Sequence, residues 1–151
     1  MATILWIDDY AGQGYSKNGK RLGFDALIYF VELKGHQVKI VSTTDEIETA
    51  LNSISSYDII ILDIIMQPLS NSKHTNHHLG GVDVLEVLSK SLIKKPIIIF
   101  SVMQPRKIRE EAVRRGLDIK KIGVKTIERK GALTPTKLAE LVEKHLPKST
   151  L

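Results

Sequence analysis

Three acidic residues follow strongly apolar segments of the sequence, where their carboxylates could act together. Asp8 and Asp9 come directly after the apolar residues 3–7, and Asp63 comes after the apolar residues 59–62. If the two segments are neighbouring parallel strands, their carboxyl ends bring these side chains to one edge of the sheet. Grouped carboxylates need a cation, and Mg²⁺ suits them because it accepts one or two carboxylates and completes its coordination with water and phosphate oxygens. Since a carboxylate can itself be a nucleophile, the set predicts magnesium-assisted phosphoryl chemistry.

A hydroxyl and a lysine complete the chemical set. Ser101 follows a further apolar segment, residues 97–100, and is therefore expected at the same edge of the sheet. A lysine near the end of the last strand would add a point charge for a phosphate group, and Lys125 and Lys130 are both candidates. A single acid or serine after a strand is more often a turn or a helix cap. The ordered combination, rather than any one residue, therefore supports the functional interpretation.

The rest of the pattern predicts the elements that must position these residues. Five short apolar runs alternate with helical patterns, which is typical of a parallel sheet with helices on both faces. The expected strands are residues 3–7, 38–41, 59–62, 97–100 and 124–127. The expected helices lie near residues 24–31, 43–54, 82–92, 106–115 and 134–145. The predicted fold is α/β and doubly wound, in a single domain that spans residues 1–151.

Composition limits the class of protein. The absence of cysteine excludes disulfides and thiolate metal sites, and no apolar run reaches the length of a membrane span, so a cytoplasmic protein is expected. The net charge of +5 would suit an acidic partner or nucleic acid. An aromatic share of 5% offers no stacking platform, however, so nucleic acid is not favoured. The densest basic run, residues 106–115, has Ile108, Ala112 and Val113 at helical spacing, and its charges are expected to form the solvated face of a helix.

The sequence resembles the response-regulator receiver family over nearly its whole length. The matching segments are residues 4–9, 58–66, 81–85, 96–101 and 130–133. The resemblance implies a flavodoxin-like sheet with the strand order 2-1-3-4-5. It also implies a signalling domain rather than an enzyme, one that assists its own phosphorylation with Mg²⁺ and needs no organic cofactor.

The same resemblance implies a role for each residue of the chemical set. Asp63 corresponds to the phosphorylated aspartate. The implied magnesium ligands are Asp9, Asp63, Asp8 through a water molecule, and the backbone carbonyl of Ile65. Ser101 resembles the switch hydroxyl, and Lys130 resembles the lysine that pairs with the phosphoryl group, with Lys125 as the alternative.

Two polar loops are longer than the family pattern. The loop of residues 69–79 follows the phosphoacceptor strand and contains three histidines, His74, His77 and His78. Their imidazoles could bind Zn²⁺, but no cysteine or carboxylate joins them in the loop, and their role stays open. The loop of residues 11–21 has glycines and a lysine at P-loop spacing, but Arg21 stands where the metal-binding Ser or Thr is required. We interpret this loop as a basic flap over the acidic edge.

Further departures from the family pattern concern the last strand and the approach to the phosphoacceptor. Residues 118–123 look like an insertion. Lys130 is preferred over Lys125 because the residues after Lys130 lead directly into the last helix. Ile127 stands where many receivers place a switching aromatic side chain, so a signal would pass through the hydroxyl and its backbone. Ile65 and Met103 flank the expected approach of a hydrolytic water. Because neither can orient that water, slow self-dephosphorylation is predicted.

The leading functional hypothesis is a stand-alone receiver that takes a phosphoryl group from a histidine kinase or a phosphotransfer protein. Its output is expected to be a protein contact through the surface of the fourth helix, fifth strand and last helix, because no effector domain follows Leu151. A monomer or a weak homodimer is expected. Two alternatives stay open: a degenerate receiver that binds its partner without phosphorylation, and a small aspartyl-phosphate phosphohydrolase. Against the phosphohydrolase, the paired acids of such enzymes lie two residues apart, whereas Asp8 and Asp9 are adjacent.

Overall fold

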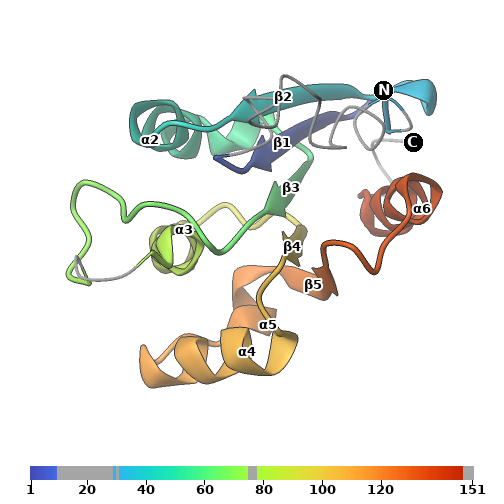
Figure 1. Ribbon diagram of the computed structural model, residues 1–151. Helices are drawn as coiled ribbons and strands as arrows, with labels where there is room; N and C mark the ends of the chain where they lie inside the picture. The colour runs from blue at the N-terminus through green and yellow to red at the C-terminus, as the bar shows by residue number, and fades with distance from the viewer. Residues whose placement is uncertain (10–28, 30, 75–77, 148–151) are drawn as a thin grey trace, which may run out of the picture.

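Five parallel strands form one sheet in the order β2-β1-β3-β4-β5 (Figure 1). The computed structural model describes residues 1–9, 29, 31–74 and 78–147. The strands are β1 (Thr3–Ile7), β2 (Gln37–Val41), β3 (Ile59–Leu62), β4 (Ile97–Ser101) and β5 (Val124–Arg129). The predicted α/β class and strand order are confirmed.

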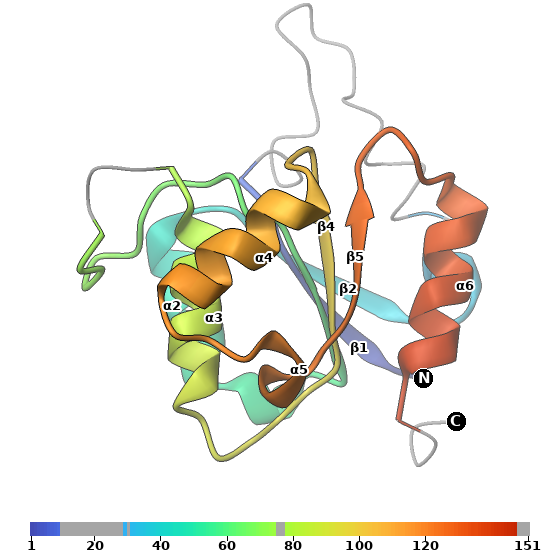
Figure 2. The same ribbon diagram turned by 90° about the horizontal axis from the view of Figure 1, so that it is seen from below.

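The helices cover both faces of the sheet, as Figures 1 and 2 show. The described helices are α2 (Thr44–Asn52), α3 (Gly80–Ser89), α4 (Pro105–Arg114), α5 (Ile119–Ile122) and α6 (Pro135–His145), with a 3₁₀ turn, η1 (Ile54–Ser56), before β3. Helices α2, α3 and α4 lie on one face, and α6 lies on the other. Most of the helix predicted near residues 24–31, and the whole loop 11–21, lie outside the described residues. No helix in the described part of the chain is both long and apolar enough to cross a membrane.

Alternating side chains of the central strands build a core on each face of the sheet. Leu5 and Ile7 of β1 belong to the cluster under α2, α3 and α4, whereas Ile4 and Trp6 belong to the cluster under α6. Every residue of β3 and β4 is buried, which is why these segments are continuously apolar in the sequence. The burial fixes the central strands, and with them the residues that follow their carboxyl ends.

The helix ends follow local signals in the sequence, with one exception. Thr43 and Glu46 form a capping box at the start of α2, and Thr134 caps α6 ahead of Pro135, as their spacing indicates. The prediction that α3 reaches Leu92 is wrong, because the helix ends at Ser89 and Leu92 is fully exposed. A lysine supplies the physical reason: the Nζ atom of Lys94 donates to the carbonyl oxygens of Leu88 and Ser89, which satisfies the end of the helix.

Residues 118–123, interpreted from the sequence as an insertion, contain the short helix α5. The Asp118 side chain accepts a hydrogen bond from the backbone N–H of Lys121 at the start of α5, and Ile122 is buried in the core. The helix ends at Gly123, whose φ of 124° favours glycine. A Cβ atom there would also lie 2.4 Å from the carbonyl oxygen of Lys95. The tight turn starts β5 beside β4, so that β5 ends next to Ser101.

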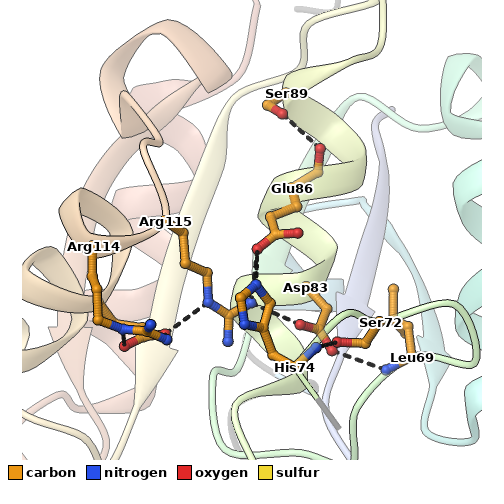
Figure 3. A network of polar contacts seen from close by, with 9 residues as sticks. Leu69, Ser72, His74, Asp83, Glu86, Ser89, Arg114 and Arg115 are labelled. Atoms are coloured by element: carbon orange, nitrogen blue, oxygen red, sulfur yellow. Dashed lines mark hydrogen bonds and ion pairs between the residues drawn. The ribbon is translucent and has the colours of Figure 1, made fainter.

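The prediction that the charges around α4 are all solvated is wrong for Arg115, as Figure 3 shows. Its side chain is 1% exposed, and its guanidinium donates to Asp83 (2.7 Å), Glu86 (3.0 Å) and Glu111 (2.7 Å). Val113, predicted to face inward, is 75% exposed. Arg115 lies one residue beyond α4, where its long side chain can reach the buried Asp83 of α3. Burial of the cation is tolerated because three carboxylates accept its hydrogen bonds.

Candidate functional site

The acidic residues lie at the carboxyl ends of two adjacent strands. The last residues of these strands, Ile7 and Leu62, are paired in the sheet. Beyond that pair, the backbone N–H of Asp63 donates to the carbonyl oxygen of Ile7 at 2.9 Å, and the N–H of Asp8 donates to that of Val41 at 3.1 Å. The ladder of hydrogen bonds therefore continues into the acids and holds their backbones beside each other.

The three carboxylates that the sequence brings to this edge form one cluster. Asp8, Asp9 and Asp63 each offer an oxygen atom, and these oxygens lie within 4.8 Å of one another. Asp8 and Asp63 are buried, and Asp9 is half-buried. Burial raises the pKa of Asp9 above its ordinary value, and the charges of Asp8 and Asp63 raise it further. The buried Oδ1 atom of Asp9 has no hydrogen-bond partner among the described residues. An oxygen left unpaired beside two other acids fits a hard cation such as Mg²⁺.

Lys130 is the lysine that the structure brings to these acids. Its Nζ atom lies 2.5 Å from the Oδ2 atom of Asp8 and 3.0 Å from the Oδ2 atom of Asp63. The residue directly follows β5, and its backbone N–H donates to the carbonyl oxygen of Ser101 at 2.9 Å. Burial pulls the pKa of Lys130 down, but Asp8 and Asp63 outweigh burial, so that the pKa is raised and the ammonium stays charged.

Lys125, the alternative from the sequence, lies near the other end of β5. Its side chain is exposed. The pKa of His145, at the end of α6, is lowered by burial and by the charges of Lys144 and Lys125. Four residues of strand separate Lys125 from Lys130. The geometry therefore brings Lys130, and not Lys125, to the acidic cluster.

Ser101 is fully buried at the end of β4, at the same edge of the sheet. Its Oγ atom accepts a hydrogen bond from the backbone N–H of Met103 at 3.2 Å. The hydroxyl therefore orients the turn that leads from β4 into α4. On the other side of the site, the backbone N–H of Ile64 donates to the Oδ1 atom of Asp63 at 2.7 Å, and Ile65 follows half-buried in the same bend.

Two consecutive glycines hold the backbone around the phosphoacceptor candidate. The N–H of Gly81 donates to the carbonyl of Ile64, and the N–H of Gly80 donates to that of Met66, both at 3.0 Å. A Cβ atom on Gly81 would lie 2.1 Å from the carbonyl oxygen of Asp63, and one on Gly80 would lie 2.0 Å from that of Gln67. Only glycine allows the start of α3 to approach the bend so closely. The sequence carries a signal for this contact, since two consecutive glycines at the start of a helical pattern indicate a close approach of the backbone.

The described histidines of the 69–79 loop do not form a metal site with one another. The Nε2 atom of His74 lies 3.3 Å from the Oε1 atom of Glu86, and the carbonyl oxygen of His78 accepts a hydrogen bond from the N–H of Met66. His77 lies outside the described residues, so the zinc hypothesis stays a prediction. Within the described ranges, the cluster of Asp8, Asp9 and Asp63 is the one group of three metal-type ligands.

Comparison with solved structures identifies the fold. The chain superposes on a CheY-like response regulator receiver domain protein from Methanospirillum hungatei with a TM-score of 0.60 and 16% identity, covering 95% of this chain and 92% of that one. It superposes on the non-phosphorylated HemR receiver domain from Leptospira biflexa with a TM-score of 0.63 and 17% identity, over 95% and 93% of the two chains. For a response regulator receiver protein from Burkholderia phymatum, the TM-score is 0.53, the identity is 19%, and the coverage is 95% and 91%.

The chain therefore has the fold of response-regulator receiver domains, and its acidic cluster lies at the carboxyl edge of the sheet where its sequence predicts it. No protein-family model matches the sequence, and a search of curated proteins found no match. The similarity is thus one of architecture, and the roles of individual residues rest on the geometry of this chain.

Proposed function

We propose that this chain is a response-regulator receiver that accepts a phosphoryl group on Asp63 in a magnesium-dependent reaction. The observation that carries the proposal is the meeting of three carboxylates with the ammonium of Lys130 at the carboxyl edge of a receiver fold. In this proposal the chain is a signalling domain and not an enzyme with a metabolite as substrate. We further propose a cytoplasmic location, in keeping with a chain that has no cysteine.

Each residue of the site has a separate role in the proposed phosphoryl transfer. The N–H of Ile64 fixes the rotation of the Asp63 carboxylate by donating to its Oδ1 atom. An Asp63 oxygen attacks phosphorus, the bond from phosphorus to the donor breaks, and the donor leaves with the electron pair of that bond. Lys130, already 3.0 Å from the acceptor carboxylate, neutralises charge on the transferred group.

The ligands proposed for Mg²⁺ are Asp9, Asp63, Asp8 through a water molecule, and the backbone carbonyl of Ile65. When bound, Mg²⁺ supplies shielding between the anionic phosphoryl oxygens and the surrounding carboxylates. The unpaired oxygen of Asp9 supports this assignment.

The proposed donor is a histidine kinase or a phosphotransfer protein, and the proposed output is contact with a partner protein through the surface of α4, β5 and α6. Ser101 would turn toward the phosphoryl group and change the β4–α4 turn that its hydroxyl now orients. Because Ile65 and Met103 carry no group that can activate water, we expect the phosphoryl group on Asp63 to last longer than seconds.

The test is incubation of the purified protein with acetyl phosphate and Mg²⁺, followed by intact-mass measurement. We expect one labile phosphoryl adduct in the wild-type protein, none in Asp63→Asn, and none when the metal is removed by chelation. A matched variant, Asp58→Asn, changes an aspartate at the opposite end of β3 and should keep the adduct. Failure of the folded wild-type protein to form any adduct would overturn the proposal and favour the degenerate receiver.

The same variants separate the receiver from a phosphohydrolase. Steady turnover of a generic phosphate ester that survives Asp63→Asn but is lost in Asp9→Asn would identify Asp9, and not Asp63, as the nucleophile. A receiver is expected to show no such turnover with either variant.

A further inference from the structure

A cavity of about 450 Å³ lies between α2, the loop that follows β3, and α3. It is lined in part by Glu48, Leu51, Leu69, Lys73, Val87 and Lys90. Its volume falls in the range of about 300 to 1,000 Å³ that small-molecule sites occupy. None of its lining residues belongs to the acidic cluster at the carboxyl edge of the sheet. The proposed phosphoryl chemistry therefore leaves this cavity without a role.

Hydrogen bonds fix the loop that forms one wall of the cavity. The Oε1 atom of Glu48, on α2, accepts from the backbone N–H of Ser70 at 2.9 Å. The Oδ2 atom of Asp83, on α3, accepts from the N–H of Leu69 at 3.0 Å, and Figure 3 shows this contact beside the one from Arg115. The loop is thus tied to both helices. A wall held in this way costs little to order when a ligand binds.

The charged side chains around the cavity differ in whether they already have a hydrogen-bond or ion-pair partner. Its acids hold hydrogen bonds: Glu48 and Asp83 accept from the loop, and Asp83 and Glu86 also accept from the buried guanidinium of Arg115. Its two lysines are exposed, and neither Lys73 nor Lys90 has an ion pair with another described residue. The charged groups of the lining that have no partner among the described residues are therefore the two lysines, although the carboxylate of Glu48 accepts only from a backbone N–H and keeps its negative charge.

The apolar part of the lining comes from three different elements. Leu51 lies on α2, Leu69 lies in the loop, and Val87 lies on α3. Val87 is an exposed large apolar residue in the last turn of a helix that otherwise buries such side chains, and Leu69 is almost fully buried. Together they offer a surface against which a flat or branched hydrocarbon can pack.

We propose that this cavity binds a small amphipathic anion, an organic carboxylate with an aromatic or branched aliphatic body. The body packs against Leu51, Leu69 and Val87, and the carboxylate pairs with Lys73 and Lys90 at the mouth of the cavity. Binding requires neither Mg²⁺ nor phosphorylation, so the site stands independently of the function proposed above.

The test uses 2-naphthoate as the probe and follows backbone amide resonances of the isotope-labelled protein by NMR. Saturable shifts are expected at residues on the three walls, including Leu51, Leu69 and Val87. The cationic analogue 2-naphthylmethylamine should shift the same amides with at least tenfold weaker affinity. Equal binding of the two probes, shifts confined to another surface, or no saturable shifts would overturn the proposal.

Variants decide whether the lining residues hold the probe. Val87→Glu places an acid against the hydrocarbon body and should weaken 2-naphthoate binding at least tenfold. The double change of Lys73 and Lys90 to Ala should weaken it about three- to tenfold, since each exposed ion pair contributes modestly. The matched control is Lys107→Ala, an exposed lysine of α4 that does not line the cavity and should leave binding unchanged. Unchanged binding in folded Val87→Glu would also overturn the proposal.

Discussion

Among the described residues, Asp8, Asp9 and Asp63 hold more negative charge than the one lysine that contacts them, Lys130, can neutralise. Lys130 contacts Asp8 and Asp63, and burial together with these two neighbours raises the pKa of Asp9. Without a metal, the folded protein therefore carries a cluster whose charges repel one another. In the proposed function, this repulsion lowers the stability of the metal-free protein at a site that binds a cation and an anionic phosphoryl group.

We predict that Asp9→Asn makes the metal-free protein more stable and removes its response to Mg²⁺. Loss of one carboxylate within 4.8 Å of two others should raise the free energy of unfolding by about 1 kcal/mol or more. Each pair of carboxylates repels by about 3.5 kcal/mol at that separation and an effective dielectric near 20, and the lost attraction to Lys130 offsets part of the gain. Urea unfolding with and without Mg²⁺ measures both effects. In the wild-type protein Mg²⁺ should raise the midpoint, and in Asp9→Asn it should not.

The control for this prediction is Glu110→Gln, which removes an exposed acid from α4. It should change the stability by less than about 0.5 kcal/mol and keep the Mg²⁺ response. A magnesium-induced shift of wild-type size in Asp9→Asn would show that the cluster does not bind the ion in the way proposed.

We predict that Lys130→Met slows phosphorylation of Asp63 at least tenfold, whereas Lys125→Met leaves the rate unchanged. The reason is position, because the Lys130 ammonium lies 3.0 Å from the acceptor carboxylate and Lys125 is exposed near the other end of the same strand. Lys130→Met removes the positive charge that stabilises the negatively charged transition state, whereas Lys125→Met does not. Time courses of adduct formation with acetyl phosphate measure the rates, and a slow Lys125→Met would reverse the assignment.

At the scale of elements, α3 positions the acidic site by direct backbone contact. Gly80 and Gly81 bring the start of the helix against the bend of residues 63–67, and the helix N–H groups bond to carbonyl oxygens of that bend. The bend includes Asp63 and the carbonyl of Ile65 that we propose as a metal ligand. Any change that separates helix and bend should therefore disturb both stability and metal binding.

We predict that Gly81→Ala lowers the free energy of unfolding by about 2 kcal/mol or more, because the new methyl group would lie 2.1 Å from the carbonyl oxygen of Asp63 and force the backbone to move. The matched control is Gly116→Ala, where φ is 74° but the surrounding space is open. That change should cost only about 1 kcal/mol of backbone strain. Urea unfolding compares the two variants. Equal losses of unfolding free energy would mean that the close contact with Asp63 does not determine the cost of Gly81→Ala.

Arg115 joins α3 and α4 through the nearly fully buried carboxylate of Asp83 and the more exposed carboxylates of Glu86 and Glu111. We predict that Arg115→Met destabilises the protein by about 3 to 5 kcal/mol, because it leaves the buried Asp83 without its cation. The control, Arg114→Met, removes a cation that is 61% exposed and should cost less than about 1 kcal/mol. Chemical unfolding of the two variants measures the difference, and similar losses would contradict the prediction.

Glu111 makes the stability that this network contributes depend on pH. A hydrogen bond from Arg114, with further help from Arg115, outweighs burial and lowers the pKa of Glu111 from 4.5 to about 2. A carboxyl group whose pKa is lower in the folded state adds stability that is complete above pH 4.5 and is lost as the pH falls through about 2. The stability difference between wild type and Glu111→Gln should therefore shrink as the pH falls below 4.5.

At the scale of the whole molecule, the sequence predicts what repeats regularly and misses what depends on long side chains. Continuous burial of β3 and β4 makes their apolar runs unmistakable, and the caps at Thr43 and Thr134 are local signals, so strands and helix starts were predictable. The contact of Arg115 with Asp83 joins residues 32 positions apart in the chain, and no periodicity indicates it. The cavity is equally long-range, because its walls come from two helices and a loop.

The acidic cluster was predictable for a similar reason. Parallel strands with a known order bring their carboxyl ends to one edge, so Asp8, Asp9 and Asp63 meet once the strands are identified. The choice between two lysines was harder, because it depends on where β5 begins and ends. Helix α5 and the turn at Gly123 set that register, and neither has a strong periodic signal in the sequence.

In the proposed function, a signal from Asp63 crosses the molecule to the surface of α4, β5 and α6, and we propose that the hydroxyl of Ser101 starts it. The hydroxyl oxygen now accepts the N–H of Met103, which lies in the turn before α4. If the hydroxyl turns to donate to a phosphoryl group, that turn must rearrange, and α4 follows. We predict that beryllofluoride with Mg²⁺, a stable phosphoryl mimic, shifts amide resonances throughout α4 and β5 in the wild-type protein. In Ser101→Ala the shifts should stay near Asp63, whereas Ser101→Thr should restore them. Shifts in α4 that persist in Ser101→Ala would show that the signal takes another route, and the buried link from Asp83 to Arg115 would then be the next candidate to test.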